Sequence, residues 1–169
     1  ACVNLLERLA RLEKVLLVVK TNTRGTGALS HEEKIRFSGK NNVKYAGYAN
    51  HSPCLIRQAD IVINFASSIG FEALLQGKPV CSPRYLNGNG TIFDDSGVVV
   101  DANDVSDVLN FIEFVKNGQY KKIPNEVWST FHRQYILGGR ENEDVLSDYL
   151  HLLMFEPALS KSSSALVNL

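Results

Sequence analysis

The sequence predicts an α/β domain of three layers, in which helices cover a mostly parallel sheet of about five or six strands. Apolar, β-branched runs of strand length alternate along the chain with amphipathic segments of helix length, a pattern typical of βαβ units. The run Ile61-Val62-Ile63 is apolar and β-branched, as in a strand that is covered on both faces. A chain of 169 residues can bury one sizeable core, so we expect one domain over 1–156 and a frayed tail over 157–169.

The first elements follow from these patterns in chain order. Leucines fall on one helical stripe over 3–13, and the next run, 15–19, is a buried strand. A short strand over 43–47 follows, and then a helix over 52–58 with a proline in its first turn. The remaining expected elements are strands over 61–65, 79–82 and 98–100, and helices over 69–76, 105–115, 126–135 and 144–155. We expect the five strands to form one parallel sheet.

Composition limits the classes of partner. Lys+Arg and Asp+Glu both count 18, and no basic block is present, so a nucleic-acid partner is not indicated. No apolar run reaches membrane-span length and the first residues lack a signal-peptide pattern, so we expect a cytoplasmic protein without a transmembrane segment. Cys2, Cys54 and Cys81 lack metal-ligand spacing and are expected to be buried thiols, with no metal site.

The segment 60–83 carries the strongest functional signal. Its apolar strand leads into small polar residues, of which Ser67 or Ser68 can cap the helix that follows. Gly70 leaves the first helical turn without a side chain. An anion could therefore approach the backbone N–H groups at the positive end of the helix dipole.

A carboxylate lies in the same helical turn. Glu72 can accept hydrogen bonds from hydroxyl groups there, and a phosphate site beside a hydroxyl-binding acid indicates a nucleotide or a nucleotide-sugar. The alternative is structural, because a capped turn followed by an acid that complements the helix dipole produces the same pattern.

The segment also resembles a known family. Its pattern, AD-x-V-I-x-x-x-S-S-x-G-x-E-A-L-x-x-G-K-P-V, is similar to the C-terminal half of GT-B-type glycosyltransferases and of the related sugar-nucleotide 2-epimerases, above all to bacterial enzymes of capsule and surface-polysaccharide assembly. The resemblance covers about residues 15–112. It implies a Rossmann-like domain that holds a nucleotide-sugar donor through Ser67, Ser68, Gly70 and Glu72, with no cofactor besides this donor substrate.

Further candidates follow from the rule that ligands of an open parallel sheet bind beyond the carboxyl ends of its strands. Arg24 follows the first strand and can clamp a phosphate. His51 follows the second and is a weak candidate for a general base. After the fourth strand, Tyr85 can stack on a base or sugar, and Asn87 and Thr91 can donate hydrogen bonds. The structural alternatives are a surface ion pair for Arg24, simple solvation for His51 and turn formation for residues 87–91.

Three functions remain open on this resemblance. The first is a donor-binding glycosyltransferase domain of surface or capsular polysaccharide biosynthesis. The second is a fragment of a nucleotide-sugar 2-epimerase, and the third is a non-catalytic nucleotide- or polysaccharide-binding module. The third is favoured by residues 20–24, where Lys-Thr-Asn-Thr-Arg stands in place of the Lys-x-His-Pro common in similar enzymes. We expect an N-terminal acceptor domain outside this chain, no complete enzyme within it, and attachment to the inner membrane only through other parts of the enzyme.

Overall fold

The computed structural model describes residues 2–20, 30–47 and 49–138. The chain divides into two compact units, 1–124 and 125–169. In the second unit the described element is α6 (Asn125–Tyr135), which confirms the helix predicted there. The predicted helix over 144–155, the tail over 157–169 and the domain boundary at 156 lie outside the described residues.

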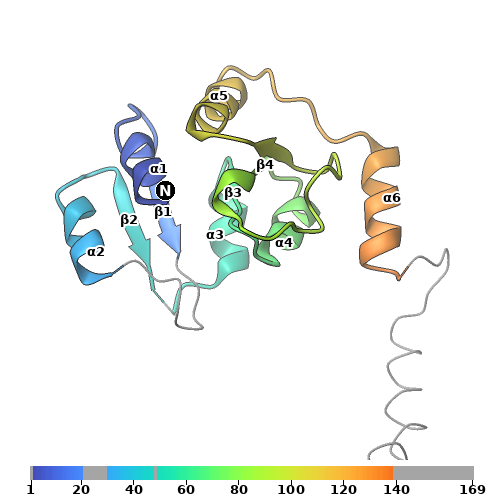
Figure 1. Cartoon of the computed structure of the whole chain (residues 1–169), viewed down its shortest axis with the longest axis horizontal. Coiled ribbons are helices and arrows are strands. Elements are labelled where there is room, and N and C mark those ends of the chain that lie inside the picture. Colours follow the sequence, from blue (N-terminus) through green and yellow to red (C-terminus); the bar gives the residue numbers. More distant parts are fainter. Residues whose placement is uncertain (1, 21–29, 48, 139–169) are drawn as a thin grey trace, which may run out of the picture. The chain divides into compact units, whose positions relative to one another are not determined.

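Five parallel strands form two small sheets in the described part of the first unit (Figure 1). One sheet pairs β1 (Leu17–Lys20) with β2 (Val43–Ala46). The other has the order β3 (Val62–Ile63), β4 (Val80–Pro83), β5 (Val100–Ala102). The predicted strands and their parallel direction are thus confirmed, whereas the single continuous sheet is not. A two-residue β3 offers few backbone groups with which β1 could form a ladder.

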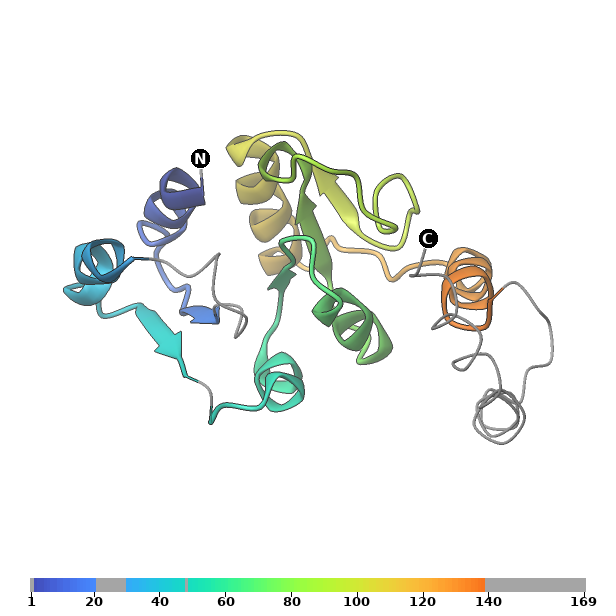
Figure 2. The same cartoon turned by 60° about the horizontal axis from the view of Figure 1, so that its bottom comes forward.

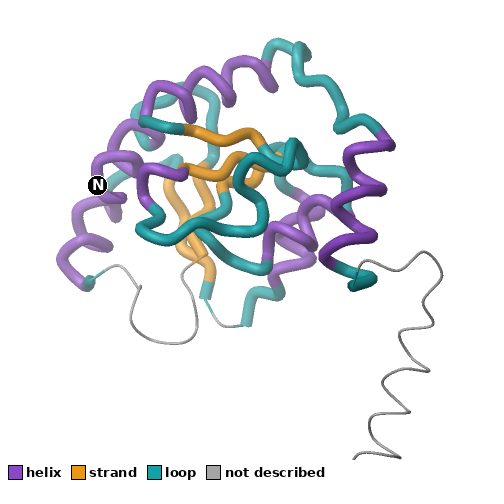
Figure 3. Tube along the Cα trace, turned by 45° about the vertical axis from the view of Figure 1, so that its right-hand side comes forward, coloured by secondary structure: helices purple, strands orange, loops and turns teal. Residues whose placement is uncertain are grey.

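Helices surround these strands (Figure 3). The described elements of the first unit besides the strands are α1 (Cys2–Leu9), α2 (His31–Ser38), α3 (Ser52–Gln58), α4 (Ile69–Leu75), the 3₁₀ turn η1 (Arg84–Leu86) and α5 (Val105–Lys116). Four of the helices were predicted. The sequence analysis missed α2 because its polar sequence, HEEKIRFS, has no apolar stripe, although Phe37 packs in the core.

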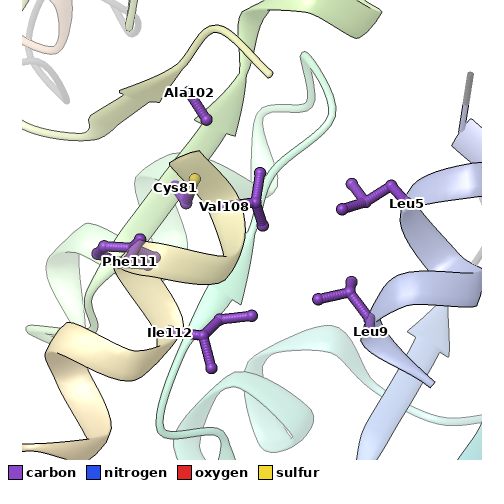
Figure 4. Close-up of a cluster of buried hydrophobic side chains, with 7 residues drawn as sticks. All are labelled: Leu5, Leu9, Cys81, Ala102, Val108, Phe111 and Ile112. Atoms are coloured by element: carbon purple, nitrogen blue, oxygen red, sulfur yellow. The ribbon is translucent and has the colours of Figure 1, made fainter. Parts of the chain in front are cut away.

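The core contains residues from both sheets. Leu5 and Leu9 on α1 face Val108 and Ile112 on α5, as Figure 4 shows. Further apolar side chains packed against this cluster come from β1, β3 and the residues beside them, namely Val15, Leu17, Ile61 and Ile63. The adjoining side of α1 packs against the first sheet and α2 through Leu6, Ala10, Phe37 and Val43. Because α1 contributes to both clusters, it connects the two sheets.

Helices cover both faces of the β3-β4-β5 sheet. Cys81 and Ala102 belong to the cluster formed with α5, whereas α4 approaches Asn64 through Gly70. Figure 2 shows α4 and α5 on different sides of these strands. Neighbouring side chains in a strand point to opposite faces. The residues on either side of Cys81 in β4 therefore point to the face that α4 covers.

Two helix ends are defined by particular residues. The Asp104 side chain accepts a hydrogen bond from the Asp107 N–H at 3.0 Å, which caps α5. Gly77 has φ +66° just beyond α4, a backbone conformation that glycine adopts without strain. Each of these residues satisfies a backbone requirement of the helix end at which it lies.

The expectation of three buried thiols is wrong for two of them. Cys81 is fully buried in β4, but Cys2 and Cys54 are exposed. Both exposed cysteines lie in the first turn of a helix, α1 and α3 respectively, where a side chain can project away from the core.

No helix among the described residues is long and apolar enough to cross a membrane.

Candidate functional site

The Ser67–Glu72 segment lies where the sequence analysis placed it, between β3 and the first turn of α4. It is at the carboxyl end of a parallel strand, the edge at which open α/β sheets bind ligands. Ala66 just before it has φ +48°, a left-handed conformation that costs an alanine about 1–2 kcal/mol. The backbone is thus strained beside the candidate site.

Hydrogen bonds within the turn already engage most of its N–H groups. The Ser67 N–H donates to Asn64 Oδ1 at 3.3 Å, and the Ile69 N–H donates to Ser67 Oγ at 3.4 Å. The N–H groups of Gly70 and Phe71 donate to the carbonyls of Ser67 and Ser68 at 3.1 and 3.0 Å. An anion at this helix end would therefore depend on the exposed hydroxyl side chains more than on a bare row of amides.

Ser68 occupies the N-cap position without acting as a side-chain cap. Its backbone is helical, with φ −58° and ψ −15°, and its side chain makes no capping hydrogen bond. Of the two serines predicted as the cap, Ser67 is the one whose side chain bonds to the helix end, because its Oγ accepts the Ile69 N–H. Both serines are exposed.

Gly70 has a packing role in the structure. A Cβ atom added at Gly70 would lie 2.7 Å from Asn64 Nδ2, 2.9 Å from Phe93 Cζ and 3.2 Å from Phe93 Cε2. The space left by the missing side chain is therefore filled by Asn64 and Phe93, which explains the glycine without a ligand. Contact between Gly70 and a ligand stays a prediction.

Glu72 and Asn64 each contain a buried polar atom without a hydrogen-bond partner among the described residues. These atoms are Glu72 Oε2 and Asn64 Nδ2. Asn64 is 1% exposed and Glu72 is half-buried. Burying a polar group without a partner costs about 1–3 kcal/mol, so each atom is suited to gain a hydrogen bond from a bound molecule.

The three candidates that follow β4 have different surroundings in the structure. Thr91 is engaged locally, because its N–H and hydroxyl both donate to the Asp94 carboxylate at 2.8 Å. The Tyr85 ring packs against the cluster that α1 and α5 form, and burial raises the pKa of its phenol. Asn87 follows η1 and its Nδ2 is buried without a partner among the described residues. The structure thus places Tyr85 in the core on the face opposite Gly70.

Two candidates remain, His51 and Arg24. His51 precedes α3, where it is exposed and makes no side-chain cap bond. Arg24 lies outside the described residues. Arg84, at the start of the loop after β4, forms a bidentate pair with Asp95, with Nη1 to Oδ1 at 2.6 Å and Nη2 to Oδ2 at 3.1 Å.

The sequence analysis also missed two polar residues within neighbouring strands, Ser82 in β4 and Asp101 in β5, and treated Asn64, just after β3, only as part of the polar turn. Each carries a buried side-chain atom without a partner among the described residues. Burial also raises the pKa of Asp101, despite a hydrogen bond from the Asp95 N–H and the nearby Arg84. The signal was present in the sequence, because the apolar runs IVI, PVC and VVV end at these three residues.

Neither a protein-family model nor a curated protein sequence matches this chain. Among the described residues no group of His, Cys, Asp and Glu side chains is arranged to hold a metal ion.

Proposed function

We propose that this chain is the donor-binding domain of a GT-B-type glycosyltransferase of surface or capsular polysaccharide biosynthesis, and that it binds a nucleotide-sugar at the Ser67–Glu72 turn. The observation that carries the proposal is the half-buried Glu72, whose Oε2 has no partner among the described residues, in the same turn as exposed Ser67 and Ser68. The sequence pattern of this segment supports the same reading, because it resembles that family.

A Rossmann-like fold is part of the proposal. If β1 lies next to β3, the five strands follow the order β2-β1-β3-β4-β5, which has its topological switch between β1 and β3. The core supports this arrangement, since Leu17 of β1 and Ile63 of β3 pack against one cluster. The Ser67–Glu72 turn follows β3 and would lie beside that switch.

In this function the hydroxyls of Ser67 and Ser68 donate to the donor's diphosphate, and Glu72 accepts hydrogen bonds from ribose or sugar hydroxyls. Hydroxyl donors aimed at the phosphates stabilise the negative charge that builds up as the nucleotide leaves. The N–H groups of the turn contribute indirectly, because their internal hydrogen bonds hold the two serines in place.

Calorimetric titration tests this assignment with uridine, cytidine and guanosine nucleotides, the corresponding nucleotide-sugars, and inorganic pyrophosphate. Glu72→Gln removes a charge-assisted hydrogen bond of about 1.5–3 kcal/mol, so it should weaken the nucleotide-sugar about tenfold to a hundredfold. Its pyrophosphate affinity should stay unchanged. Ser68→Ala should instead weaken every phosphate-containing ligand.

Glu113→Gln is the matched control, because Glu113 is a carboxylate on α5 whose ion pair with Lys116 lies at the surface. It should bind every ligand as the wild type does. If Glu72→Gln also binds nucleotide-sugars with wild-type affinity, the carboxylate serves only to complement the helix dipole and the assignment of the donor site is wrong.

A further inference from the structure

Three polar side chains lie in one row across the β3-β4-β5 sheet. The ladders pair Ile63 with Cys81 and Ser82 with Asp101, and the Asn64 N–H donates to the Cys81 carbonyl at 2.8 Å. Asn64 therefore lies beside Ser82, and Ser82 beside Asp101. Residues paired in parallel strands point to the same face, so these three residues, here named the polar row, share the face that α4 covers.

Each member of the polar row has a buried atom with no hydrogen-bond partner among the described residues. The atoms are Asn64 Nδ2, Ser82 Oγ and Asp101 Oδ1. Asn64 and Ser82 are both 1% exposed, whereas the Asp101 side chain is 21% exposed. The row thus runs from a buried amide donor, through a hydroxyl, to a carboxylate acceptor that reaches the surface.

A short segment lies beside both ends of this row. Residues 91–97, here named the strap, place Phe93 against Gly70, and the ring centroid of Phe93 is 4.9 Å from that of Phe71. The strap is held at the exposed end of the row by two contacts of Asp95. Its N–H donates to Asp101 Oδ2 at 2.9 Å, and its carboxylate pairs with Arg84. The Asp95 side chain is 78% exposed, so the pairing with Arg84 is a surface contact that solvent weakens.

The chemistry of the row selects its ligand. The Asn64 amide needs an acceptor, the Asp101 carboxylate needs a donor, and the Ser82 hydroxyl can be either. A fully ionised phosphate offers no donor to Asp101, and a metal cation offers no acceptor to Asn64. Hydroxyl groups are donors and acceptors at once, and several on one ring can meet side chains on strands that lie about 4.8 Å apart.

We propose that Asn64, Ser82 and Asp101 form a binding site for the sugar ring of the donor, which enters when the strap moves outward. This site is additional to the Ser67–Glu72 turn, and it rests on the proposed function for the identity of the ligand as a donor. The same hydroxyl chemistry could be supplied by a free sugar, so the test includes both sources.

The side-chain amide of Asn64 reports directly on the row in an NMR titration of the full chain. Its ¹H and ¹⁵N resonances should shift with UDP-glucose, with other nucleotide-sugars or with methyl glucoside, and shift less with inorganic pyrophosphate, which reaches Asn64 only through the Ser67 N–H. The Asn42 side chain is the internal control, because its Nδ2 already donates to the Ala10 carbonyl at 3.3 Å. A shift with nucleotide-sugars alone identifies the donor as the source of the ring, and a shift with methyl glucoside as well identifies a site for carbohydrate itself.

Ser82→Ala separates binding from folding. Since Ser82 Oγ has no partner among the described residues, its removal should leave the free energy of unfolding unchanged or higher. It should weaken nucleotide-sugars about threefold to tenfold, the loss of one neutral hydrogen bond, and leave the corresponding nucleotides unaffected. Ser106→Ala, at an exposed position of α5, should change neither quantity.

The outcomes decide the two proposals separately. An Asn64 amide that moves with none of the sugar-containing probes, or moves equally with UDP and UDP-glucose, overturns the sugar site whatever Glu72→Gln does. A Ser82→Ala protein that still distinguishes UDP-glucose from UDP as the wild type does also overturns it. A third outcome is that the Glu72→Gln protein binds nucleotide-sugars with wild-type affinity while methyl glucoside still shifts the Asn64 amide. That pair of results would overturn the proposed function and leave a carbohydrate site.

Discussion

Gly70→Ala is the sharpest test of how the candidate site is packed. An added Cβ would lie 2.7 Å from Asn64 Nδ2 and 2.9 Å from Phe93 Cζ, closer than carbon atoms pack in folded proteins. Overpacking of this kind costs about 1–3 kcal/mol, and the better helix propensity of alanine returns about 0.5–1 kcal/mol. We therefore expect the free energy of unfolding to fall by about 1–2 kcal/mol.

Urea unfolding followed by circular dichroism measures this change, and the melting temperature should fall by about 2–8 °C. Gly39→Ala is the matched control, because a Cβ at Gly39 would meet nothing within 4 Å. Its effect should stay within about 0.5 kcal/mol.

A double-mutant cycle with Phe93→Leu identifies the atom responsible. Leucine lacks the ring atoms nearest the added Cβ, so Gly70→Ala should cost about 1 kcal/mol less in the Phe93→Leu background than in the wild type. A Gly70→Ala protein as stable as the wild type would refute the packing argument. It would also restore the view that Gly70 keeps the helix end open for a ligand.

Three further changes have defined outcomes. Ala66→Gly should raise the free energy of unfolding by about 1 kcal/mol in a urea titration, because glycine adopts the observed φ of +48° without strain; a decrease would show that Ala66 is not strained. Asp104→Ala should lower it by about 1 kcal/mol through loss of the α5 cap, whereas Asp60→Ala, at an exposed position before β3, should have little effect. Burial raises the pKa of the Cys81 thiol from 9.0 to about 12, so as pH rises the thiol loses its proton first in the unfolded state. The free energy of unfolding should therefore fall as pH rises from about 9 towards 12. Cys81→Ala should reduce this fall, and a Cys81→Ala protein with the same pH profile as the wild type would contradict the assignment of the fall to this thiol.

Much of the fold could be predicted because its signals are local. The run from Leu17 to Val19 is apolar and β-branched, and such a run has few alternatives to a buried strand. Pro53 and Asp104 each satisfy a requirement of the helix end beside them. The α2 helix could not be found in this way, because its charged sequence has no periodic apolar pattern, although Phe37 packs in the core.

The site was predicted less completely because it depends on contacts between distant residues. The sequence showed that Gly70 lacks a side chain, but the atoms that fill the space come partly from Phe93 on another segment. Tyr85 likewise reads as a loop aromatic, and only the fold shows that it packs on the α1 and α5 cluster. The polar row required the register of three strands, which no single segment determines.

Asn64 links the two proposed parts of the site. Its Oδ1 accepts the Ser67 N–H and so holds the turn that would bind the diphosphate, while its Nδ2 lies under Gly70 at the buried end of the polar row. A donor whose phosphates contact Ser67 and whose sugar reaches Ser82 would therefore act on both ends of one amide. Displacement of Phe93 by the sugar would relieve the close approach at Gly70. Gly70→Ala should consequently cost less free energy in the ligand-bound protein than in the free protein, a difference that thermal unfolding with and without a saturating nucleotide-sugar would measure.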